Sequence, residues 1–266
     1  QVVADGFDSF DFPDLSENAT ATLYYTAGTT AKPKGVFFSH RQIVLHTMAL
    51  GLSSGCFHTR AGFSAFDTYM PLTPLYHEHG WGTPYLATLV GARQIYPGRH
   101  NPHTALELIR DQKVTFSHCL PTMLHMIMSD PLVDEVDLSR LKLIVSGAKI
   151  SRQLAQDAMG KGLNIYSGYG MSEACPLISV SHLKPDKGHS TKDRLDAVTS
   201  AGIPAPLVEL KIVDHLGTPL PHDGSSVGEI VVRSPWLTKG YYGDPDRGHK
   251  LWRDGWLHTG DIGFID

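Results

Sequence analysis

The decisive stretch is Thr26-Ala27-Gly28-Thr29-Thr30-Ala31-Lys32-Pro33-Lys34-Gly35, ten residues of a 266-residue chain. It lies between two apolar runs, Leu23–Tyr25 and Val36–Phe38, that are typical of short β-strands. Small residues let the backbone come close to a ligand, and the N–H groups of such a loop can converge on an anion. The threonine hydroxyls add hydrogen-bond donors, and Lys34 adds a positive charge. The stretch therefore predicts a loop that binds a polyphosphate rather than a plain polar turn.

This loop differs from the phosphate-binding loop of the Walker type, which has the pattern GxxxxGK[ST] and opens a helix. Here the loop leads into the strand Val36–Phe38 instead. Ser39 then follows as the predicted N-cap of a helix that runs to about Leu52. The sequence thus predicts a strand, a phosphate loop, a second strand and a helix.

Strands and helices alternate through the middle of the chain. Such alternation favours an α/β fold with mostly parallel sheets and helices on both faces. The expected elements are a helix from Asn101-Pro102 to Gln112, a strand at Val114–Phe116, a helix from Pro121 to Met128, a strand at Leu141–Val145, a helix from Ser151 to about Lys161, and a strand at Asn164–Tyr166.

The composition changes near residue 200, where helix signals fade. Alternating strands are expected at Val208–Val213 and Glu229–Arg233, joined by a turn-rich segment. The polar segment Lys184–Arg194 predicts a mobile surface loop. We therefore expect a lead-in segment over residues 1–20, an α/β part over 21–200, and a smaller β-rich subdomain toward the C-terminus over 201–266.

Composition excludes several classes of function. Apolar residues make up 41% and charged residues 19%, and 23 Lys+Arg against 27 Asp+Glu give a net charge of −4. This balance is typical of an ordinary globular protein and argues against nucleic acid as a partner. No apolar run has the length of a transmembrane segment. The three scattered cysteines predict reduced thiols and a cytoplasmic location.

Two local patterns suggest other chemistry and are set aside. The run His77-Glu78-His79 is the one dense group of histidines, but no third metal ligand has a recognisable spacing and HExxH is absent. Residues 224–228, Gly-Ser-Ser-Val-Gly, fit the GxSxG pattern of hydrolases. A nucleophile elbow needs a strand before it and a helix after it, whereas a strand is expected to follow here. We interpret this second pattern as a hairpin turn.

The stretch 26–35, with Ser39-His40 after the next strand, resembles the phosphate loop of the acyl-adenylate-forming enzymes. That family includes acyl-CoA synthetases, luciferases and the adenylation domains of peptide synthetases. Its usual pattern is [ST]-[SG]-G-[ST]-[ST]-G-x-P-K-G. The chain departs from the pattern at Ala27 and at Ala31, where glycine is usual. If position 31 needs a positive φ, alanine costs on the order of 1 kcal/mol there.

Further motifs of the family follow in the expected order, and the likeness to fatty-acyl-CoA synthetases extends over nearly the whole chain. One motif alone could arise by chance, whereas several in order carry the resemblance. They are Pro74-Leu75-Tyr76-His77, Ser146-Gly147-Ala148, Ser167-Gly168-Tyr169-Gly170-Met171-Ser172-Glu173, Lys239-Gly240-Tyr241-Tyr242, and Gly255-Trp256-Leu257-His258-Thr259-Gly260-Asp261.

The resemblance assigns roles to these residues. Catalytic roles fall to Lys34, Thr29, Ser172 and Glu173, with Ser172 on the α-phosphate and Glu173 as the ligand of Mg²⁺. The nucleotide would be bound by Thr26, Gly28, Thr30 and Gly35 at the phosphates, by Gly147, Ala148, Gly168, Tyr169 and Gly170 around the adenine, and by Asp261 at the ribose. The acyl group would contact His77, Trp81 and Met123.

The implied activity is ATP-dependent activation of a carboxylic acid, a fatty acid first of all, to acyl-AMP and pyrophosphate, followed by transfer to CoA. ATP/AMP and Mg²⁺ are the expected cofactors, CoA is the co-substrate, and a homodimer is left open. An aryl-acid CoA ligase and a carrier-loading adenylation domain remain alternatives. So does a non-catalytic nucleotide-binding module, which Ala27, Ala31 and the lack of the family's lysine-bearing C-terminal domain would favour. We expect the natural chain to continue beyond both ends and the 266 residues alone to have incomplete activity.

Overall fold

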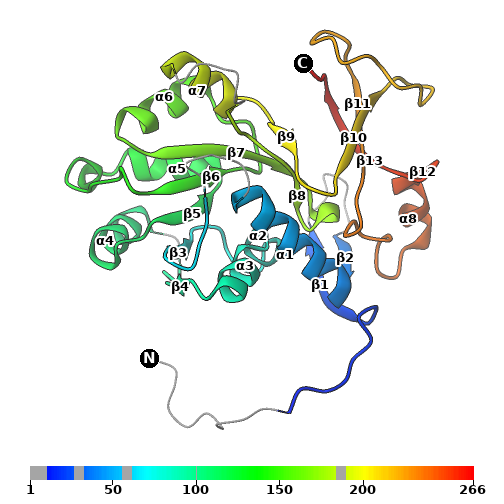
Figure 1. The fold of residues 1–266 in the computed structure, drawn as a ribbon, viewed down its shortest axis with the longest axis horizontal. Coiled ribbons are helices and arrows are strands. Elements are labelled where there is room, and N and C mark those ends of the chain that lie inside the picture. The colour runs from blue at the N-terminus through cyan, green and yellow to red at the C-terminus, as the bar shows by residue number, and fades with distance from the viewer. Residues whose placement is uncertain (1–10, 27–32, 56–61, 100, 184–189) are drawn as a thin grey trace.

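The computed structural model describes residues 11–26, 33–55, 62–99, 101–183 and 190–266. Within these ranges the strands form three sheets: a two-stranded hairpin, a large sheet of seven strands, and a sheet of four strands near the C-terminus (Figure 1). The expected α/β fold with a smaller β-rich part is confirmed. No helix in these ranges combines the length and the apolar composition that a membrane span needs.

The seven-stranded sheet is the centre of the α/β part. The first five strands in sheet order, β4, β3, β5, β6 and β7, pair parallel to one another. The pairs β7 with β8 and β8 with β9 are antiparallel. In sheet order the strands are β4 (Arg93–Gln94), β3 (Thr68–Pro71), β5 (Phe116–Cys119), β6 (Lys142–Val145), β7 (Asn164–Gly170), β8 (Leu177–Val180) and β9 (Ile203–Pro204).

Helices cover both faces of this sheet, and alternate residues of its strands point to opposite faces. On one face Leu143 joins a core with α4, α5 and α6, while on the other Tyr69 and Phe116 pack with α1 and α3. The helices are α1 (His40–Gly55), α2 (Glu78–Trp81), α3 (Thr83–Val90), α4 (Pro102–Gln112), α5 (Pro121–Met128), α6 (Arg152–Gly160), α7 (Thr191–Val198) and α8 (Pro245–Leu251), with 3-10 turns η1 (Pro131–Asp134) and η2 (Ser172–Ala174).

The predicted caps explain where several helices begin. Ser39 Oγ accepts from the N–H of Gln42 at 3.3 Å, and Gln42 Oε1 accepts from the N–H of Ser39 at 2.8 Å. This reciprocal pair is a capping box, which satisfies two backbone groups at the start of α1. Asn101 and Ser151 cap α4 and α6 with their side-chain oxygens, as predicted.

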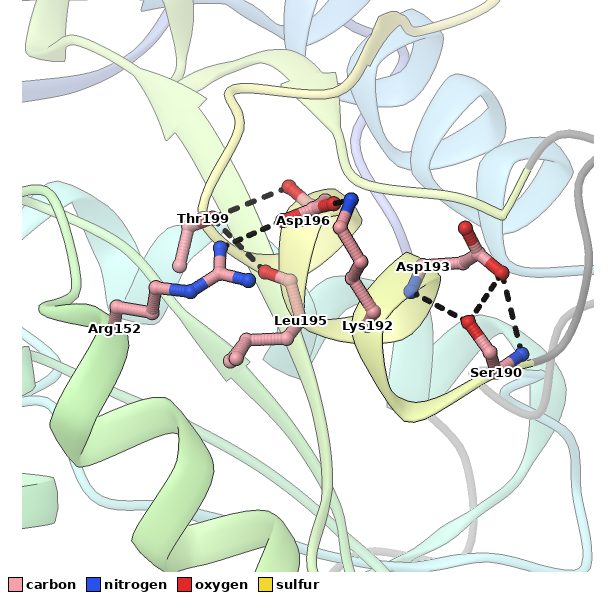
Figure 2. Close-up of polar contacts among 7 residues, drawn as sticks. All are labelled: Arg152, Ser190, Lys192, Asp193, Leu195, Asp196 and Thr199. Atoms are coloured by element: carbon pink, nitrogen blue, oxygen red, sulfur yellow. Dashed lines mark hydrogen bonds and ion pairs between the residues drawn. The ribbon is translucent and has the colours of Figure 1, made fainter.

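The prediction of a loop over Lys184–Arg194 is wrong for its second half. Residues 184–189 lie outside the described ranges, but α7 begins at Thr191 (Figure 2). Ser190 Oγ accepts from the N–H of Asp193 at 3.1 Å, and the Asp193 carboxylate accepts from the N–H of Ser190 at 3.3 Å. The capping box outweighs the polar composition of the segment and starts a helix there. The strand expected at Val114–Phe116 is also displaced, because β5 starts only at Phe116.

The C-terminal sheet is entirely antiparallel. Its order is β10 (Glu209–Val213), β11 (Gly228–Arg233), β13 (Trp256–Gly263) and β12 (Trp252–Arg253). The pattern at residues 224–228 lies in the connection from β10 to β11 and leads into a strand, so it is a turn as predicted. The Asp223 carboxylate holds this turn by accepting from the N–H groups of Ser225 and Ser226.

Candidate nucleotide site

The predicted phosphate loop begins and ends on a β-hairpin. Strands β1 (Thr20–Thr26) and β2 (Lys34–Ser39) pair antiparallel, with Thr26 opposite Lys34 at the end that the loop joins. Gly28, Thr29 and Thr30 lie outside the described residues, so their roles stay predictions. Gly35 accepts a hydrogen bond on its carbonyl from the N–H of Tyr242 at 2.8 Å. The hairpin therefore fixes Lys34 against the C-terminal part of the chain.

Tyr241 links the two charged residues of the predicted catalytic set. Its hydroxyl donates to Glu173 Oε1 at 2.5 Å, and Lys34 Nζ lies 3.5 Å from the same hydroxyl and 5.1 Å from the ring centroid. Glu173 is 7% exposed and Tyr241 8%. Burial, and then the Glu173 charge, raises the pKa of the Tyr241 hydroxyl, which stays a donor. The motif at residues 239–242 pointed to this segment, but the contact itself was not predicted.

A second link joins the predicted adenine and ribose residues. The parallel pairing of β6 and β7 ends at Val145 and Ser167, so Tyr169 lies beyond it on β7. The Tyr169 hydroxyl donates to Asp261 Oδ2 at 2.7 Å, and Asp261 comes from β13 of the other sheet. Burial, and then the nearby Asp261 carboxylate, raises the pKa of Tyr169. The structure thus brings together two residues 92 positions apart that the motifs had assigned to one nucleoside.

Two glycines of the predicted adenine pocket are required by the backbone. A Cβ on Gly170 would lie 1.9 Å from the carbonyl oxygen of Pro176. Gly147 has a φ of +83°, and a Cβ there would lie 2.4 Å from Leu120 Cδ2. Gly147 and Ala148 are exposed just after β6. Gly168, on β7, pairs with Val180 of β8. Gly170 therefore allows β7 to approach the segment before β8 closely, and Gly147 allows the left-handed backbone that follows β6.

A cleft of about 310 Å³ lies where the hairpin, η2 and the C-terminal sheet meet. It holds Lys34 and Glu173 and extends to Thr259 and Gly260, next to Asp261. Ser172, next to Glu173 in the chain, is not among the lining residues, and its carbonyl accepts from the Tyr24 hydroxyl. Residues that line the cleft are Lys34, Met171, Glu173, Glu229, Tyr241, Arg247, Lys250, Leu251, Arg253, His258, Thr259 and Gly260.

The cleft fits a magnesium nucleotide by its chemistry. Mg²⁺ is usually bound in proteins by one or two carboxylates together with phosphate oxygens of the substrate. Glu173 offers one buried carboxylate at the cleft wall, and Lys34 offers a cation beside it. No group of three or more His, Cys, Asp or Glu in the described ranges could hold a metal ion by itself. A metal here would therefore depend on the phosphates for its remaining ligands.

Comparison with known proteins shows the family to which the chain belongs. The sequence profile of the AMP-binding enzymes matches residues 4–242. The chain belongs to the AMP-binding enzyme family. A long-chain-fatty-acid–CoA ligase from Thermus thermophilus is 37% identical over 259 residues, which are 95% of this chain and 46% of that protein. A medium-chain-fatty-acid–CoA ligase from Ectopseudomonas oleovorans is 33% identical over 100% of this chain and 48% of its own length.

The fold of the AMP-binding family is also found by structure. A long-chain-fatty-acid-CoA ligase from Archaeoglobus fulgidus superimposes with a TM-score of 0.78 and 27% identity, over 93% of this chain and 49% of that chain. The chain thus spans about half the length of the relatives it matches. The predicted resemblance to acyl-adenylate-forming enzymes is confirmed.

The three residues predicted for the acyl group of this AMP-binding chain are not brought together at the cleft. His77 is exposed and precedes α2, while Trp81 is 8% exposed and stacks on His118 at 4.9 Å between ring centroids. Met123 lies in the main hydrophobic core, because the apolar face of α5 packs on the sheet. None of the three lines the cleft. Their contact with an acyl group stays a prediction.

His118 was not singled out by the sequence. It is fully buried on β5, its Nε2 lies 2.7 Å from the Tyr69 hydroxyl, and its Nδ1 lies 3.2 Å from Thr73 Oγ1. Burial lowers the pKa of His118 to about 3, so the ring is neutral beneath Trp81. No motif surrounds this histidine, so only the packing of β3, β5 and α2 identifies it.

Proposed function

We propose that this chain supplies the nucleotide site of an enzyme that activates a carboxylic acid with ATP and passes the acyl group to CoA. The observation that carries the proposal is the cleft lined by Lys34 and Glu173, which extends to Gly260. The next residue in the chain, Asp261, accepts the hydrogen bond from Tyr169. A fatty acid is the proposed substrate, since the named relatives are long-chain and medium-chain fatty-acid–CoA ligases. ATP, Mg²⁺ and CoA are the proposed small-molecule partners.

In the first step a carboxylate oxygen of the acid bonds to the α-phosphorus, and the bond from that phosphorus to the bridging oxygen breaks. Acyl-AMP forms, and pyrophosphate leaves with the electron pair. Lys34 would offset the negative charge on the phosphates, and the Ser172 hydroxyl would donate to an α-phosphate oxygen. Bound Mg²⁺, held by Glu173, would supply further charge neutralisation. The Tyr241 hydroxyl holds the Glu173 carboxylate in place by the bond at 2.5 Å.

The nucleoside is positioned by the second pair. Asp261 would accept hydrogen bonds from the ribose hydroxyls, and the Tyr169 hydroxyl orients that carboxylate by donating to it. The Tyr169 ring would stack on the adenine beside Gly147 and Ala148. In the second step a thiol of CoA attacks the acyl carbonyl and AMP leaves. Fixed geometry of this kind lowers the entropic part of both barriers.

Two finer proposals concern the setting of the enzyme. A cytoplasmic location is supported by Cys119 and Cys175, which are buried free thiols. Fractionation of cells that express the tagged protein tests the location. A homodimer stays a prediction from family resemblance, and light scattering of the purified chain tests it.

The nucleotide site is tested by calorimetry with a stable acyl-adenylate analogue, decanoyl-sulfamoyl-adenosine, and with its benzoyl counterpart. We expect saturable binding, tighter for the decanoyl compound, and a loss of about tenfold for Asp261→Asn because a charged hydrogen bond to the ribose is removed. Asp214→Asn is the matched control, a half-buried aspartate in the turn after β10 that does not line the cleft. Absence of saturable binding would contradict the proposal, and tighter binding of the benzoyl compound would favour an aryl-acid ligase.

A further inference from the structure

Three basic side chains form a wall of the cleft that no motif had indicated. Arg247 and Lys250 come from α8, and Arg253 comes from β12. Together with Lys34 on the hairpin they surround the position of Glu173 and Tyr241. The cleft is therefore bordered by cations from two segments about 200 residues apart in the sequence.

The charges in the cleft do not cancel. Four basic side chains face two carboxylates, Glu173 and Glu229, which leaves an excess of two positive charges in a chain of net charge −4. Glu229 is already engaged, because one of its oxygens lies 2.8 Å from His258 Nδ1 and the other accepts from the N–H of Gly260 at 3.1 Å. Arg247 is also paired with Asp244, which does not line the cleft, so one positive charge remains in excess once this carboxylate is counted. A concave site with an excess of positive charge favours an anionic ligand.

Arg247 is close to the predicted catalytic residues. Arg247 lines the same cleft as Tyr241, the residue that also contacts Lys34. Its positive charge lowers the pKa of the Tyr241 hydroxyl, whereas burial and Glu173 raise it. Arg247 Nε lies 3.2 Å from the Asp244 carboxylate, which caps α8 and holds the arginine at the cleft. The other nitrogens of a guanidinium can bind phosphate oxygens in a fork.

We propose that Arg247 and Lys250, with Arg253 beside them in the lining of the cleft, bind the β- and γ-phosphates of ATP and the pyrophosphate that leaves. This inference rests on the proposed function and adds basic residues from α8 and β12 to a polyphosphate site that also includes Lys34. When the α-phosphorus separates from the bridging oxygen, the electron pair stays on the β-phosphate. Fixed cations beside that oxygen stabilise the developing charge.

Calorimetry with inorganic pyrophosphate, AMP and adenosine 3′,5′-bisphosphate separates the sources of such an anion. The test variant is Arg247→Gln with Lys250→Gln. The control is Arg152→Gln with Lys192→Gln, a pair of basic residues that contact Asp196 (Figure 2). They belong to α6 and α7, which lie away from α8 (Figure 1). We expect pyrophosphate binding to weaken by about 100-fold in the test variant, about tenfold for each charged contact, and AMP binding to stay within twofold. The control should leave both unchanged.

Three results would overturn the inference. The first is that the test variant binds pyrophosphate as tightly as the parent chain does. The second is that its affinity for AMP falls as much as its affinity for pyrophosphate. The third is that only the affinity for adenosine 3′,5′-bisphosphate falls, since this compound carries the phosphates of the CoA nucleotide. AMP binding reports separately on the proposed function, because AMP lacks the β- and γ-phosphates. If AMP fails to bind while pyrophosphate binds through Arg247 and Lys250, the proposed function is wrong and the polyphosphate site stands.

Discussion

Replacement of Tyr241 by phenylalanine tests the contact that joins the phosphate hairpin to the C-terminal part of the chain. The substitution keeps the buried ring and removes the hydroxyl that donates to Glu173 at 2.5 Å. Glu173 is 7% exposed, so water replaces the lost donor poorly. A buried hydrogen bond to a charged group contributes about 1.5–3 kcal/mol, and we expect the free energy of unfolding to fall by about 2 kcal/mol.

Urea denaturation at pH 7 measures this change. For a slope of about 3 kcal/mol per molar urea, the midpoint should fall by about 0.7 M. The thermal midpoint should fall by about 4 °C, since a domain of this size loses roughly 2 °C per kcal/mol. Tyr242→Phe is the matched control, because Tyr242 is 63% exposed and only its backbone N–H is bonded to the hairpin. Equal stability of Tyr241→Phe and the parent chain would refute the reasoning.

Three further predictions concern stability. Gly170→Ala should lower the free energy of unfolding by about 3 kcal/mol or more, because the added Cβ would lie 1.9 Å from a backbone oxygen. The control is Gly160→Ala, where the added Cβ has open space around it and should change the free energy by less than about 1 kcal/mol. Thermal denaturation measures both changes. Asp67 pairs with Lys142 at 2.6 Å; burial alone would raise the pKa of Asp67, but hydrogen bonds from Lys142 and from a threonine lower it. The stability from this pair is present above about pH 4 and is lost as pH falls through the lowered pKa of Asp67. Asp67→Asn should therefore cost about 2 kcal/mol at pH 7, and urea titrations should show this cost shrinking as pH falls through that pKa. Burial lowers the pKa of His118 to about 3, so below about pH 6.5 the unfolded chain binds a proton at this histidine that the folded chain does not bind. His118 should therefore contribute about 2 kcal/mol to the fall in unfolding free energy from pH 7 to pH 5, beside a similar contribution from the buried His46, whose pKa burial also lowers to about 3. A His118→Gln variant should show a fall that is smaller by about 2 kcal/mol.

Local signals in the sequence predicted much of the fold. Asn101 and Ser151 mark helix starts because their side chains satisfy backbone groups a few residues away. The same kind of signal was present at Ser190 and Asp193, but the polar composition of that segment favoured a loop. The antiparallel pairing of β8 was not predicted, since an apolar strand of four residues looks the same in either direction.

The candidate site was predicted in its parts and not in its connections. Motifs indicated Lys34 and Glu173 because their chemistry suits phosphates and Mg²⁺. The role of Tyr241 depends on a contact 207 residues away in the sequence, which only the packing of β2 against the C-terminal segment creates. Arg247 and Lys250 carried no motif, because isolated basic residues on a short helix are ordinary solvent-exposed groups until a cleft forms beside them.

The most direct test of the central claim is a crystal structure of the chain with decanoyl-sulfamoyl-adenosine bound. The account predicts the adenine against the Tyr169 ring, the ribose hydroxyls on the Asp261 carboxylate, and the sulfamoyl group directed toward Lys34 and Glu173. An ordered analogue bound elsewhere, or a ribose that makes no contact with Asp261, would contradict it.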